Sequence, residues 1–365
     1  MVLRLMPVLL SRLLTVLEGI APLSYAEDWD NVGLLIDPAG TAAISVSRLL
    51  LTIDLTPTVM NEASERRADM IVAYHPPIFK GVRRLRQSAP GERVIMQAIR
   101  SGLPVYSPHT AVDAAPGGVN DWLAQGLGPG VCEPLVQAAH RGSAGECRVG
   151  VLTNPDDVER LQRALVEEVG VVRIARSGTR RVDVSGRQRD ELWLEFVVKQ
   201  SALAQVTAVL TRVRPGGDCV WDVLPLADKP HLGAGMGRGV RLQDALKLPE
   251  IVALLKQHLG LEQLWVAASE RHERRDHQIE RVAVCAGAGG SLFENLKGYD
   301  LYVTGEMRHH DVREKVAEGA SVIVCGHTNT ERGYLPHLAQ RINDACPGEL
   351  KVMVSKRDRD PLVVV

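Results

Sequence analysis

The sequence predicts an α/β protein that carries a small α+β module near its middle. The first third alternates short apolar runs with amphipathic stretches, and the last third repeats this pattern. The stretch between them has a different order of expected elements. A length of 365 residues is enough for more than one hydrophobic core. We therefore expect three parts, which cover residues 1–135, 136–230 and 231–365.

An amphipathic helix is expected within residues 1–20. Leucines recur there at helical spacing and form one apolar face, made by Leu9, Leu10, Leu13, Leu14 and Leu17. Arg4, Arg12 and the lack of a small-x-small cleavage site argue against a secretory signal peptide. No apolar stretch of the sequence is long enough to cross a bilayer, so we expect no membrane contact.

Short buried strands and helices are expected to alternate in both outer thirds. In the first third, apolar runs indicate strands at residues 49–53, 70–73 and 103–106, with a helical pattern at 57–67. In the last third, similar runs indicate strands at 282–286, 301–304 and 322–325, with a helical pattern at 311–318. This alternation is typical of an α/β layer.

The middle stretch predicts the order β-α-β-β-α-β. Residues 147–152 indicate a strand, and Asn154 and Pro155 start a helix that continues through 158–169. The remaining elements are strands near Val171 and at 192–198, a helix at 201–213, a Pro-Gly-Gly turn and a strand at 219–224. This order is that of a ferredoxin-like module.

Stretches rich in glycine and other small residues suit the boundaries of this module. They cover residues 138–145 and 230–239. Within the second stretch, residues 233–239 indicate a flexible connector.

The composition excludes several classes of protein. With 45% hydrophobic and 24% charged residues, the chain is neither disordered nor a low-complexity rod. The balance of 43 basic and 44 acidic residues gives no general attraction to nucleic acid or to an anionic membrane. The six cysteines are widely spaced and form no CxxC pair, which favours a reduced, cytoplasmic protein.

Polar clusters follow three of the expected strands. His75 follows the strand at 70–73, residues 107–113 follow the strand at 103–106, and residues 326–331 follow the strand at 322–325. Ligands bind at the carboxyl ends of strands in open α/β sheets. The three clusters are therefore expected to converge on one crevice.

The residue types in these clusters suit a divalent metal ion. His327 and Glu331 are four residues apart and would share one face of a helix that begins near Asn329, and His109 and Asp113 have the same spacing. Imidazole and carboxylate ligands suit zinc, manganese or iron(II). A bridging glutamate would allow a two-metal site, which generates a hydroxide nucleophile near neutral pH.

Simpler interpretations exist for each cluster alone. A single histidine at a strand end is more often a hydrogen-bonded loop residue than a ligand. His327 with Glu331 could be only a helix start with a capping residue and an acid in its first turn. Because unliganded clusters would need three separate explanations, the three together favour a metal site.

Three further segments carry polar or glycine residues. His309 and His310 stand at an expected helix start, where exposed histidines without a role are the simpler interpretation and contact with substrate is the alternative. The glycine run 285–291 could cradle an anion or be only a tight turn, and its spacing excludes a Rossmann or Walker site. In the turn at 29–33, Asp30 and Asn31 could orient ligands or substrate.

Five motifs in this order resemble the type 2 GTP cyclohydrolase I homologues, a family also described as the NGG-one-interacting-factor-three proteins. The motifs are Ala-Glu-Asp-Trp-Asp-Asn-Val-Gly from Ala26, Tyr-His-Pro-Pro-Ile-Phe from Tyr74, Ser-Pro-His-Thr-Ala-Val-Asp from Ser107, Gly-Glu-Met-x-His-His from Gly305 and His-Thr-Asn-Thr-Glu-Arg-Gly from His327. The resemblance covers both outer thirds. The middle module is similar in pattern to the PII-like or copper-tolerance-protein-like insertion of longer members.

The resemblance implies two similar α/β halves with a metal site in the cleft between them, and a ring-shaped homohexamer. By motif, His75, Asp113 and Glu331 would bind one ion, and His327 with a bridging Glu331 the other. Many members have a second histidine where this chain has Tyr74. A neutral phenol is a poor ligand, so the second ion could bind weakly, recruit His109 or be absent.

Two functions follow from the resemblance. The first is a metal-dependent hydrolase with one or two zinc, manganese or iron ions, in which activated water attacks GTP, another nucleotide or a cyclic amide. Glu306, His309 and His310 would then be catalytic groups that move protons, and residues 287–291 or Arg332 would contact phosphate. The second is a regulatory protein that holds a structural metal and binds protein partners through the inserted module.

Overall fold

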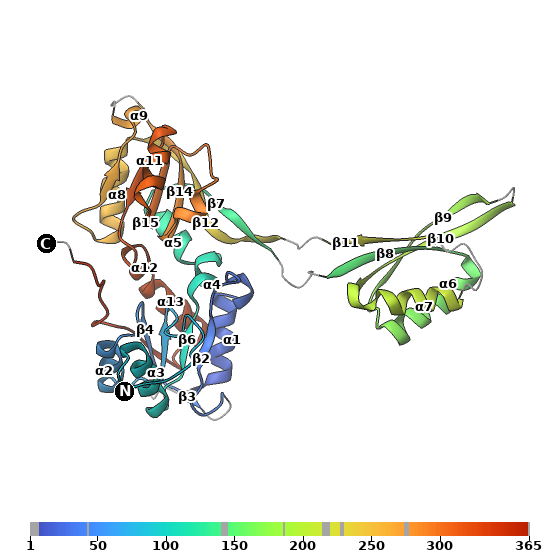
Figure 1. Cartoon of the computed structure of the whole chain (residues 1–365), viewed down its shortest axis with the longest axis horizontal. Coiled ribbons are helices and arrows are strands. Elements are labelled where there is room, and N and C mark those ends of the chain that lie inside the picture. The colour runs from blue at the N-terminus through green and yellow to red at the C-terminus, as the bar shows by residue number, and fades with distance from the viewer. Residues whose placement is uncertain are drawn as a thin grey trace. The chain divides into compact units, whose positions relative to one another are not determined.

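The computed structural model describes residues 7–41, 44–139, 145–184, 187–213, 220–226, 230–273 and 277–363. The chain divides into two compact units (Figure 1). The first unit joins residues 1–138 to residues 231–365, and the second is residues 139–230. The three-part division at residues 135 and 230 stays a prediction, since the two outer thirds form one unit.

The N-terminal part of the first unit follows the predicted alternation of strands and helices. Its elements are β1 (Val8–Leu9), α1 (Leu10–Ile20), η1 (Leu23–Tyr25), β2 (Gly33–Ile36), β3 (Ser45–Val46), β4 (Arg48–Thr52), α2 (Pro57–Glu65), β5 (Met70–Ala73), α3 (Pro90–Arg100), β6 (Val105–Ser107), α4 (His109–Ala114) and α5 (Val119–Gln125). Helix α2 begins where a local signal favours it, because Thr56 accepts a hydrogen bond from the Val59 amide and Pro57 occupies the first turn.

The C-terminal part of the first unit repeats this alternation. Its elements are β7 (Gly130–Ala139), β12 (Pro230–Leu246), α8 (Leu248–Leu259), β13 (Trp265–Ala267), α9 (Glu270–Glu273), β14 (Ile279–Ala288), α10 (Gly290–Phe293), β15 (Leu301–Glu306), α11 (His309–Ala317), β16 (Ser321–Val324), α12 (Asn329–Arg332), α13 (Leu335–Ala345) and β17 (Lys351–Val354). The predicted α/β class is confirmed.

Two sheets organise the first unit. One has the order β17-β4-β5-β6-β2, in which the first four strands are parallel and β2 is antiparallel. The other has the order β13-β16-β15-β14-β12-β7, with β16, β15 and β14 parallel. Strand β17 lies far along the chain, yet it pairs with β4 at the edge of the N-terminal sheet.

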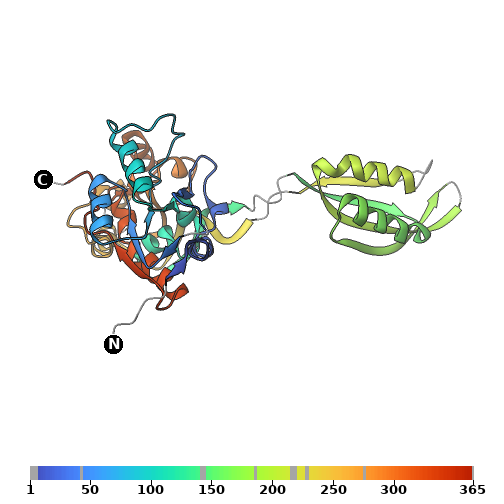
Figure 2. The same cartoon turned by 90° about the horizontal axis from the view of Figure 1, so that it is seen from below.

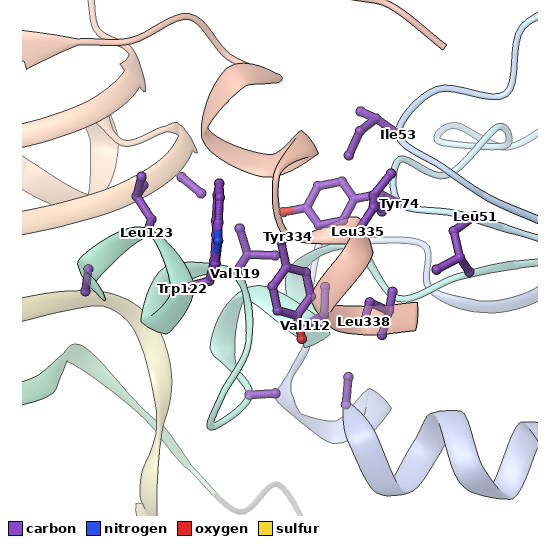
Figure 3. Packing of buried hydrophobic residues seen from close by; sticks show 14 of the residues in the cluster. Leu51, Ile53, Tyr74, Val112, Val119, Trp122, Leu123, Tyr334, Leu335 and Leu338 are labelled. Atoms are coloured by element: carbon purple, nitrogen blue, oxygen red, sulfur yellow. The ribbon is translucent and has the colours of Figure 1, made fainter. Parts of the chain in front are cut away.

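The hydrophobic core of the first unit is continuous between the two sheets. Leu49 and Leu51 of β4 belong to the same buried cluster as Val282 and Val284 of β14. Leu50 points to the opposite face of its strand and packs with α2 and α3 in a second cluster. Figure 3 shows side chains of α5 and α13 in the first cluster, near Tyr74. The two sheets therefore form one packed body, which holds residues from both in fixed positions.

One predicted connector is wrong. Residues 233–239 were expected to be flexible, but they lie within strand β12. A Cβ atom on Gly235 would come within 2.1 Å of the Val136 carbonyl oxygen in β7, and one on Gly239 within 2.6 Å of the Tyr299 hydroxyl. The glycines allow close approach of neighbouring chain, which is a structural role and not a sign of mobility.

The second unit has the predicted order β-α-β-β-α-β. Its elements are β8 (Glu146–Thr153), α6 (Pro155–Ala164), a π-helical turn η2 (Leu165–Val169), β9 (Ile174–Val184), β10 (Arg187–Lys199), η3 (Gln200–Ala202), α7 (Leu203–Val213) and β11 (Trp221–Pro225). The strand order β11-β8-β10-β9, antiparallel throughout, is that of a ferredoxin-like sheet. Helices α6 and α7 cover one face, where Val149, Leu194 and Phe196 are buried (Figures 1 and 2).

Some predictions fall on parts of the chain that the structure does not describe. These are the start of the N-terminal segment at residues 1–6, most of the expected boundary at 138–145, the Pro-Gly-Gly turn at 215–217 and the first residue of the strand expected at 219–224. Within the described residues, none of the helices combines the length and apolar character needed to cross a membrane.

Candidate metal centre

The candidate site lies where several strands of the first unit end. His75 follows β5, and His327 follows β16 of the other sheet. Glu331 lies in α12, the short helix that begins two residues after His327. The prediction that the clusters after β5 and β16 converge is therefore confirmed for these three residues.

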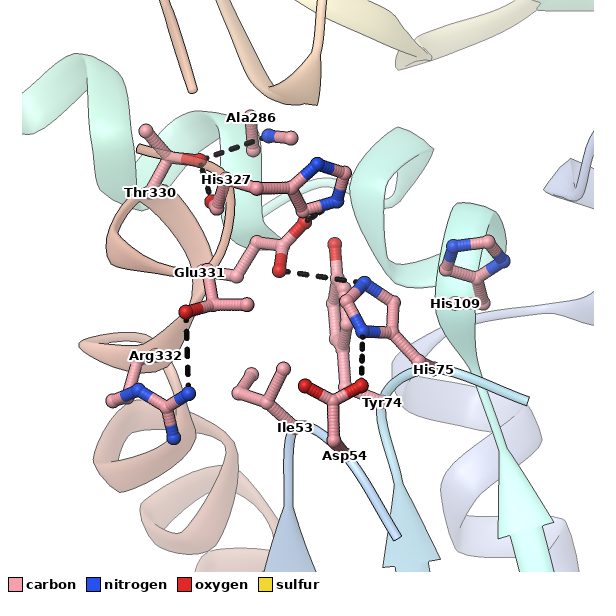
Figure 4. A network of polar contacts seen from close by, with 12 residues as sticks. Ile53, Asp54, Tyr74, His75, His109, Ala286, His327, Thr330, Glu331 and Arg332 are labelled. Atoms are coloured by element: carbon pink, nitrogen blue, oxygen red, sulfur yellow. Dashed lines mark hydrogen bonds and ion pairs between the residues drawn. The ribbon is translucent and has the colours of Figure 1, made fainter. Parts of the chain in front are cut away.

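Donor atoms of the three residues face a common point. One donor atom each of His75, His327 and Glu331 lie within 4.8 Å of one another, the grouping that a metal ion needs. Nε2 of His75 is 3.4 Å from Glu331 Oε2, and Nε2 of His327 is 3.3 Å from Glu331 Oε1 (Figure 4). The two imidazoles thus approach the two oxygens of one carboxylate.

The outer nitrogen of each imidazole is held by a second carboxylate. Nδ1 of His75 donates to Asp54 Oδ1 at 3.0 Å, and Nδ1 of His327 lies 3.2 Å from Glu306 Oε2. A carboxylate on Nδ1 fixes the tautomer that leaves the Nε2 lone pair available to a metal, and it raises the basicity of the ring. Sequence reasoning missed Asp54, although it also follows a strand end, that of β4.

His109 has the same kind of partner beside this group. Its Nδ1 is 2.8 Å from Asp30 Oδ1, and Asp30 also accepts a hydrogen bond from the Thr110 amide. The backbone of His109 has φ of +28°, which is unusual for a residue with a side chain. Its ring centroid lies 5.4 Å from that of His75. The predicted role of Asp30 as an orienting residue is consistent with these contacts.

Contacts among the three central residues shift their pKa values toward the charged forms. Burial opposes protonation of His75, but Asp54 and Glu331 outweigh it and raise the pKa of His75 to about 10. The contact with Glu331 and that with Glu306 raise the pKa of His327 to about 9. Burial of Glu331 would raise its pKa, but the two histidines lower it below its ordinary value. Cationic charge is thus favoured at this point, as expected where a metal ion binds.

The residues present fit a divalent ion. The Glu331 side chain is only 3% exposed, and its Oε2 atom makes no regular hydrogen bond to a described residue, its contact being the 3.4 Å ion pair with His75 Nε2. Burying a carboxylate without strong hydrogen bonds is costly, and a cation between it and the imidazoles would stabilise it. Two imidazoles and one carboxylate form a donor set used by zinc and by manganese and iron.

Tyr74 and Asp113 lie next to the donor group but outside it. Their side chains are buried, and the Tyr74 hydroxyl donates a short hydrogen bond to Asp113 Oδ1. Burial raises the pKa of Asp113 to about 6. Among the described residues, the cluster of donor atoms does not include Asp113 or His109. Their role as ligands stays a prediction.

Gly287 forms the wall behind the donors. Its φ is +62°, and a Cβ atom there would lie 2.8 Å from Glu331 Oε1 and 3.1 Å from His327 Nε2. Only glycine therefore allows this approach without displacing the two side chains. The predicted strand-to-helix turn is present between β14 and α10, and it contacts the candidate site.

Of the three predicted catalytic residues, Glu306 contacts the donor group, whereas His309 and His310 are exposed and make no contact with it among the described interactions. Glu306 ends β15, and its side chain is 55% exposed even though it contacts His327. His309 and His310 begin α11 and are exposed, with ring centroids 5.5 Å apart. Their catalytic roles stay a prediction.

A cavity of about 1060 Å³ opens beside His327. Its walls include Trp265, Met307 and Leu362 on the apolar side and Glu306 on the polar side. Residues that follow β17 contribute to the wall of this cavity. One of them is Asp360, which accepts a hydrogen bond of 2.5 Å from the Thr328 hydroxyl. The cavity is large enough for a small organic molecule that reaches the donor group.

Arg332, expected to contact phosphate, is already bound within the protein. Its Nη1 donates to Asp358 Oδ2 at 2.6 Å, and the same oxygen accepts from the Ile53 amide. Asp358 thus connects the residue after Glu331 with the residue before Asp54. This arginine serves the structure of the site more directly than anion binding.

Comparisons with known proteins agree with the geometry. Residues 8–361 match the profile of Duf34/NIF3 (NGG1p interacting factor 3). The chain is 38% identical over 359 residues to NIF3-like protein 1 of Bos taurus, covering 98% of this chain and 92% of that protein. It is 32% identical over 365 residues to NGG1-interacting factor 3 of Saccharomyces cerevisiae, covering 97% and 96%. The crystal structure of Staphylococcus aureus protein SA1388 is similar over 98% of this chain and 99% of that one, with TM-score 0.76 and 25% identity.

Proposed function

The chain belongs to the Duf34/NIF3 family, and from this premise we propose that it is a metal-dependent hydrolase that acts on a nucleotide or a related cyclic amide. The observation that carries the proposal is the convergence of His75, His327 and Glu331, with donor atoms within 4.8 Å of one another. The adjoining cavity of about 1060 Å³ leaves His327 accessible to a small molecule.

The roles of the side chains follow from their contacts. His75, His327 and Glu331 would hold the ion, which supplies a water of lowered pKa and polarises the bond to be cleaved. Asp54 and Glu306 keep the two imidazoles in the tautomer that presents Nε2. In this proposal Asp54 and Glu306 orient the imidazoles, and His75, His327 and Glu331 bind the ion.

Proton transfer needs a group near the donors that is not itself fully engaged. His109 offers its Nε2, because Asp30 holds Nδ1. Asp113, with a pKa of about 6, is able to carry or release a proton near neutral pH. Glu306, His309 and His310 remain our candidates on the exposed side, where a substrate could reach them.

The test is turnover by the full chain reconstituted with manganese, iron or zinc. We expect GTP to be converted, with loss of formate and formation of a triphosphate product detected by mass spectrometry, and His327→Ala to abolish the conversion. His337→Ala, an exposed histidine of α13, is the matched control and should keep full activity. Unchanged GTP and cyclic amides with every metal would refute the hydrolase proposal.

A second candidate is a regulatory protein that binds partners through the inserted unit. Two observations favour it: the name of the yeast relative describes an interaction with NGG1, and residues 139–230 form a compact unit with its own core. A chain that lacks residues 145–226 would separate the two candidates. Retained turnover with loss of a partner in pull-down would assign partner binding to the inserted unit.

A homohexamer and a cytoplasmic location complete the proposal. The hexamer rests on the family resemblance, and light scattering of the purified chain measures it. The cytoplasmic location is consistent with free cysteines at Cys132, Cys147, Cys285, Cys325 and Cys346, and fractionation of cells tests it.

A further inference from the structure

Two exposed tryptophans lie on different sides of the metal centre. The Trp29 side chain is 59% exposed and that of Trp265 is 62% exposed. Trp265 lines the cavity beside His327, whereas Trp29 contacts His109. Large exposed aromatic side chains are candidates for binding surfaces, so the surroundings of each need comparison.

Trp29 belongs to a group of three rings, which we call the aromatic platform: Trp29, Phe79 and His109. The Trp29 and Phe79 centroids are 5.9 Å apart, and they lie 6.1 Å and 6.4 Å from the centroid of His109. Phe79 is 48% exposed. The segments that carry the two larger rings are tied together, because Asn31 Nδ2 donates to the Ile78 carbonyl at 2.5 Å.

The platform is connected to the donor group through ring contacts. The centroid of His109 is 5.4 Å from that of His75, and the centroid of His75 is 5.4 Å from that of His327. The strained backbone of His109 and its contact with Asp30 hold the middle ring of this series in place. A planar group on the platform would therefore lie near the metal centre.

The two tryptophans differ in the charge around them. The loop after Phe79 carries Lys80, Arg83 and Arg84, all exposed, and no ion pair joins them to another described residue. Glu27 and Asp28 precede Trp29 and Asp30 follows it, so the cations on this side come from the loop after Phe79.

The cavity beside Trp265 has the opposite character. It is lined by Asp54, Glu306, Asp311 and Asp360, and its one arginine, Arg308, is paired with Asp311 at 2.8 Å. A polyphosphate would be repelled there, and Arg332 is held by Asp358. Charge complementarity thus assigns an anionic ligand to the side of Trp29.

We propose that the aromatic platform and the basic loop Lys80, Arg83 and Arg84 form the binding subsite for a mononucleotide. The base stacks on Trp29 and Phe79, and the phosphates contact the loop cations, because exposed rings beside cations recognise bases in this way. The inference rests on the proposed hydrolase function and narrows its substrate class to nucleotides rather than neutral cyclic amides.

Binding, rather than turnover, tests the subsite. Full-length protein freed of metal by chelation is titrated with GTP, guanosine and inorganic triphosphate by calorimetry. We expect Trp29→Ala to weaken GTP and guanosine binding by about 5- to 100-fold, the effect of losing one stacked ring. Trp221→Ala, which removes an exposed tryptophan of β11 in the inserted unit, should leave both affinities unchanged, and Trp265→Ala tests whether the cavity takes the base instead.

The loop is tested separately. The double variant Arg83→Ala and Arg84→Ala should weaken GTP and triphosphate, reduce the dependence of GTP affinity on salt and leave guanosine unchanged. Lys351→Ala, an exposed cation of β17, is the control.

Several results would overturn the subsite. These are absence of GTP binding, equal weakening by Trp265→Ala, a change of oligomeric state in Trp29→Ala, or tighter binding of a single-stranded oligonucleotide than of GTP. Turnover of GTP that Trp29→Ala leaves unchanged would refute the subsite and keep the hydrolase. GTP binding that needs the platform, without turnover by the metal-loaded protein, would refute the hydrolase and keep the subsite.

Discussion

Glu62 holds the segment that follows β17 against helix α2, and its removal gives a measurable loss of stability. The side chain is 4% exposed and accepts hydrogen bonds from the Lys356 and Arg357 amides and from the Ser355 hydroxyl, while pairing with Arg66 at 2.7 Å. These contacts outweigh burial and lower the pKa of Glu62 from 4.5 to about 2. The same segment continues to Asp358, which accepts hydrogen bonds from Ile53, beside Asp54, and from Arg332, beside Glu331.

The size of the effect follows from the pKa. A pKa of about 2 against 4.5 in the unfolded chain corresponds to about 3 kcal/mol of stability at neutral pH. Because the folded-state pKa is the lower one, this contribution is complete above about pH 4.5 and disappears as the pH falls through about 2. We expect Glu62→Gln to lower the free energy of unfolding by about 3 kcal/mol at pH 7, and by much less near pH 2.

Urea unfolding followed by circular dichroism at a series of pH values measures this difference. Glu65→Gln is the matched control, because Glu65 lies on the same helix and also pairs with the segment, through Arg357 at 2.5 Å. The Glu65 side chain is 58% exposed, so its ion pair should contribute less than about 1 kcal/mol. Equal losses in the two variants, or a loss from Glu62→Gln that is the same at pH 7 and pH 3, would refute the reasoning.

Three further predictions concern the metal centre. Glu331→Gln should weaken metal binding by about 100-fold or more, because it removes the carboxylate that faces both imidazoles, and elemental analysis after dialysis should then find little metal. Glu318→Gln, at the residue that follows α11, should retain the ion. Tyr74→His should raise the metal count per chain, because it places an imidazole beside the donor group in place of a buried phenol; Tyr74→Phe should not, and equal counts in both would contradict this. Gly287→Ala should lower both metal affinity and stability, the latter by about 1–2 kcal/mol, because the residue has positive φ and its Cβ would meet Glu331; an unchanged melting temperature would argue against the strain.

Local patterns predicted the elements of this fold well where short apolar runs are buried on both faces. The strand expected at residues 70–73 is β5, and the runs near 301–304 and 322–325 lie at β15 and β16. The carboxyl ends of these strands then located His75 and His327. Such predictions succeed because the apolar run of a buried strand and the polar residues at its end are consecutive in the sequence.

Relations between distant segments were not predictable in the same way. The pairing of β17 with β4 depends on residues about 300 positions apart, and no local pattern states it. Residues 233–239 suggested a connector, because glycine marks both flexible links and strands packed closely against neighbours. Asp54 was not predicted, although it follows β4, because its contact with His75 joins residues 21 positions apart and no local pattern marks it.

Because β17 pairs with β4, the N-terminal sheet can be completed only after residues 351–354 have been synthesised. While the ribosome is still adding residues before 351, β4 has an unpaired edge and an apolar sequence, a combination that invites association with other chains. A nascent chain therefore exposes this apolar edge until residues 351–354 have been synthesised, and the proposed ion can be captured only after Glu331 has been synthesised.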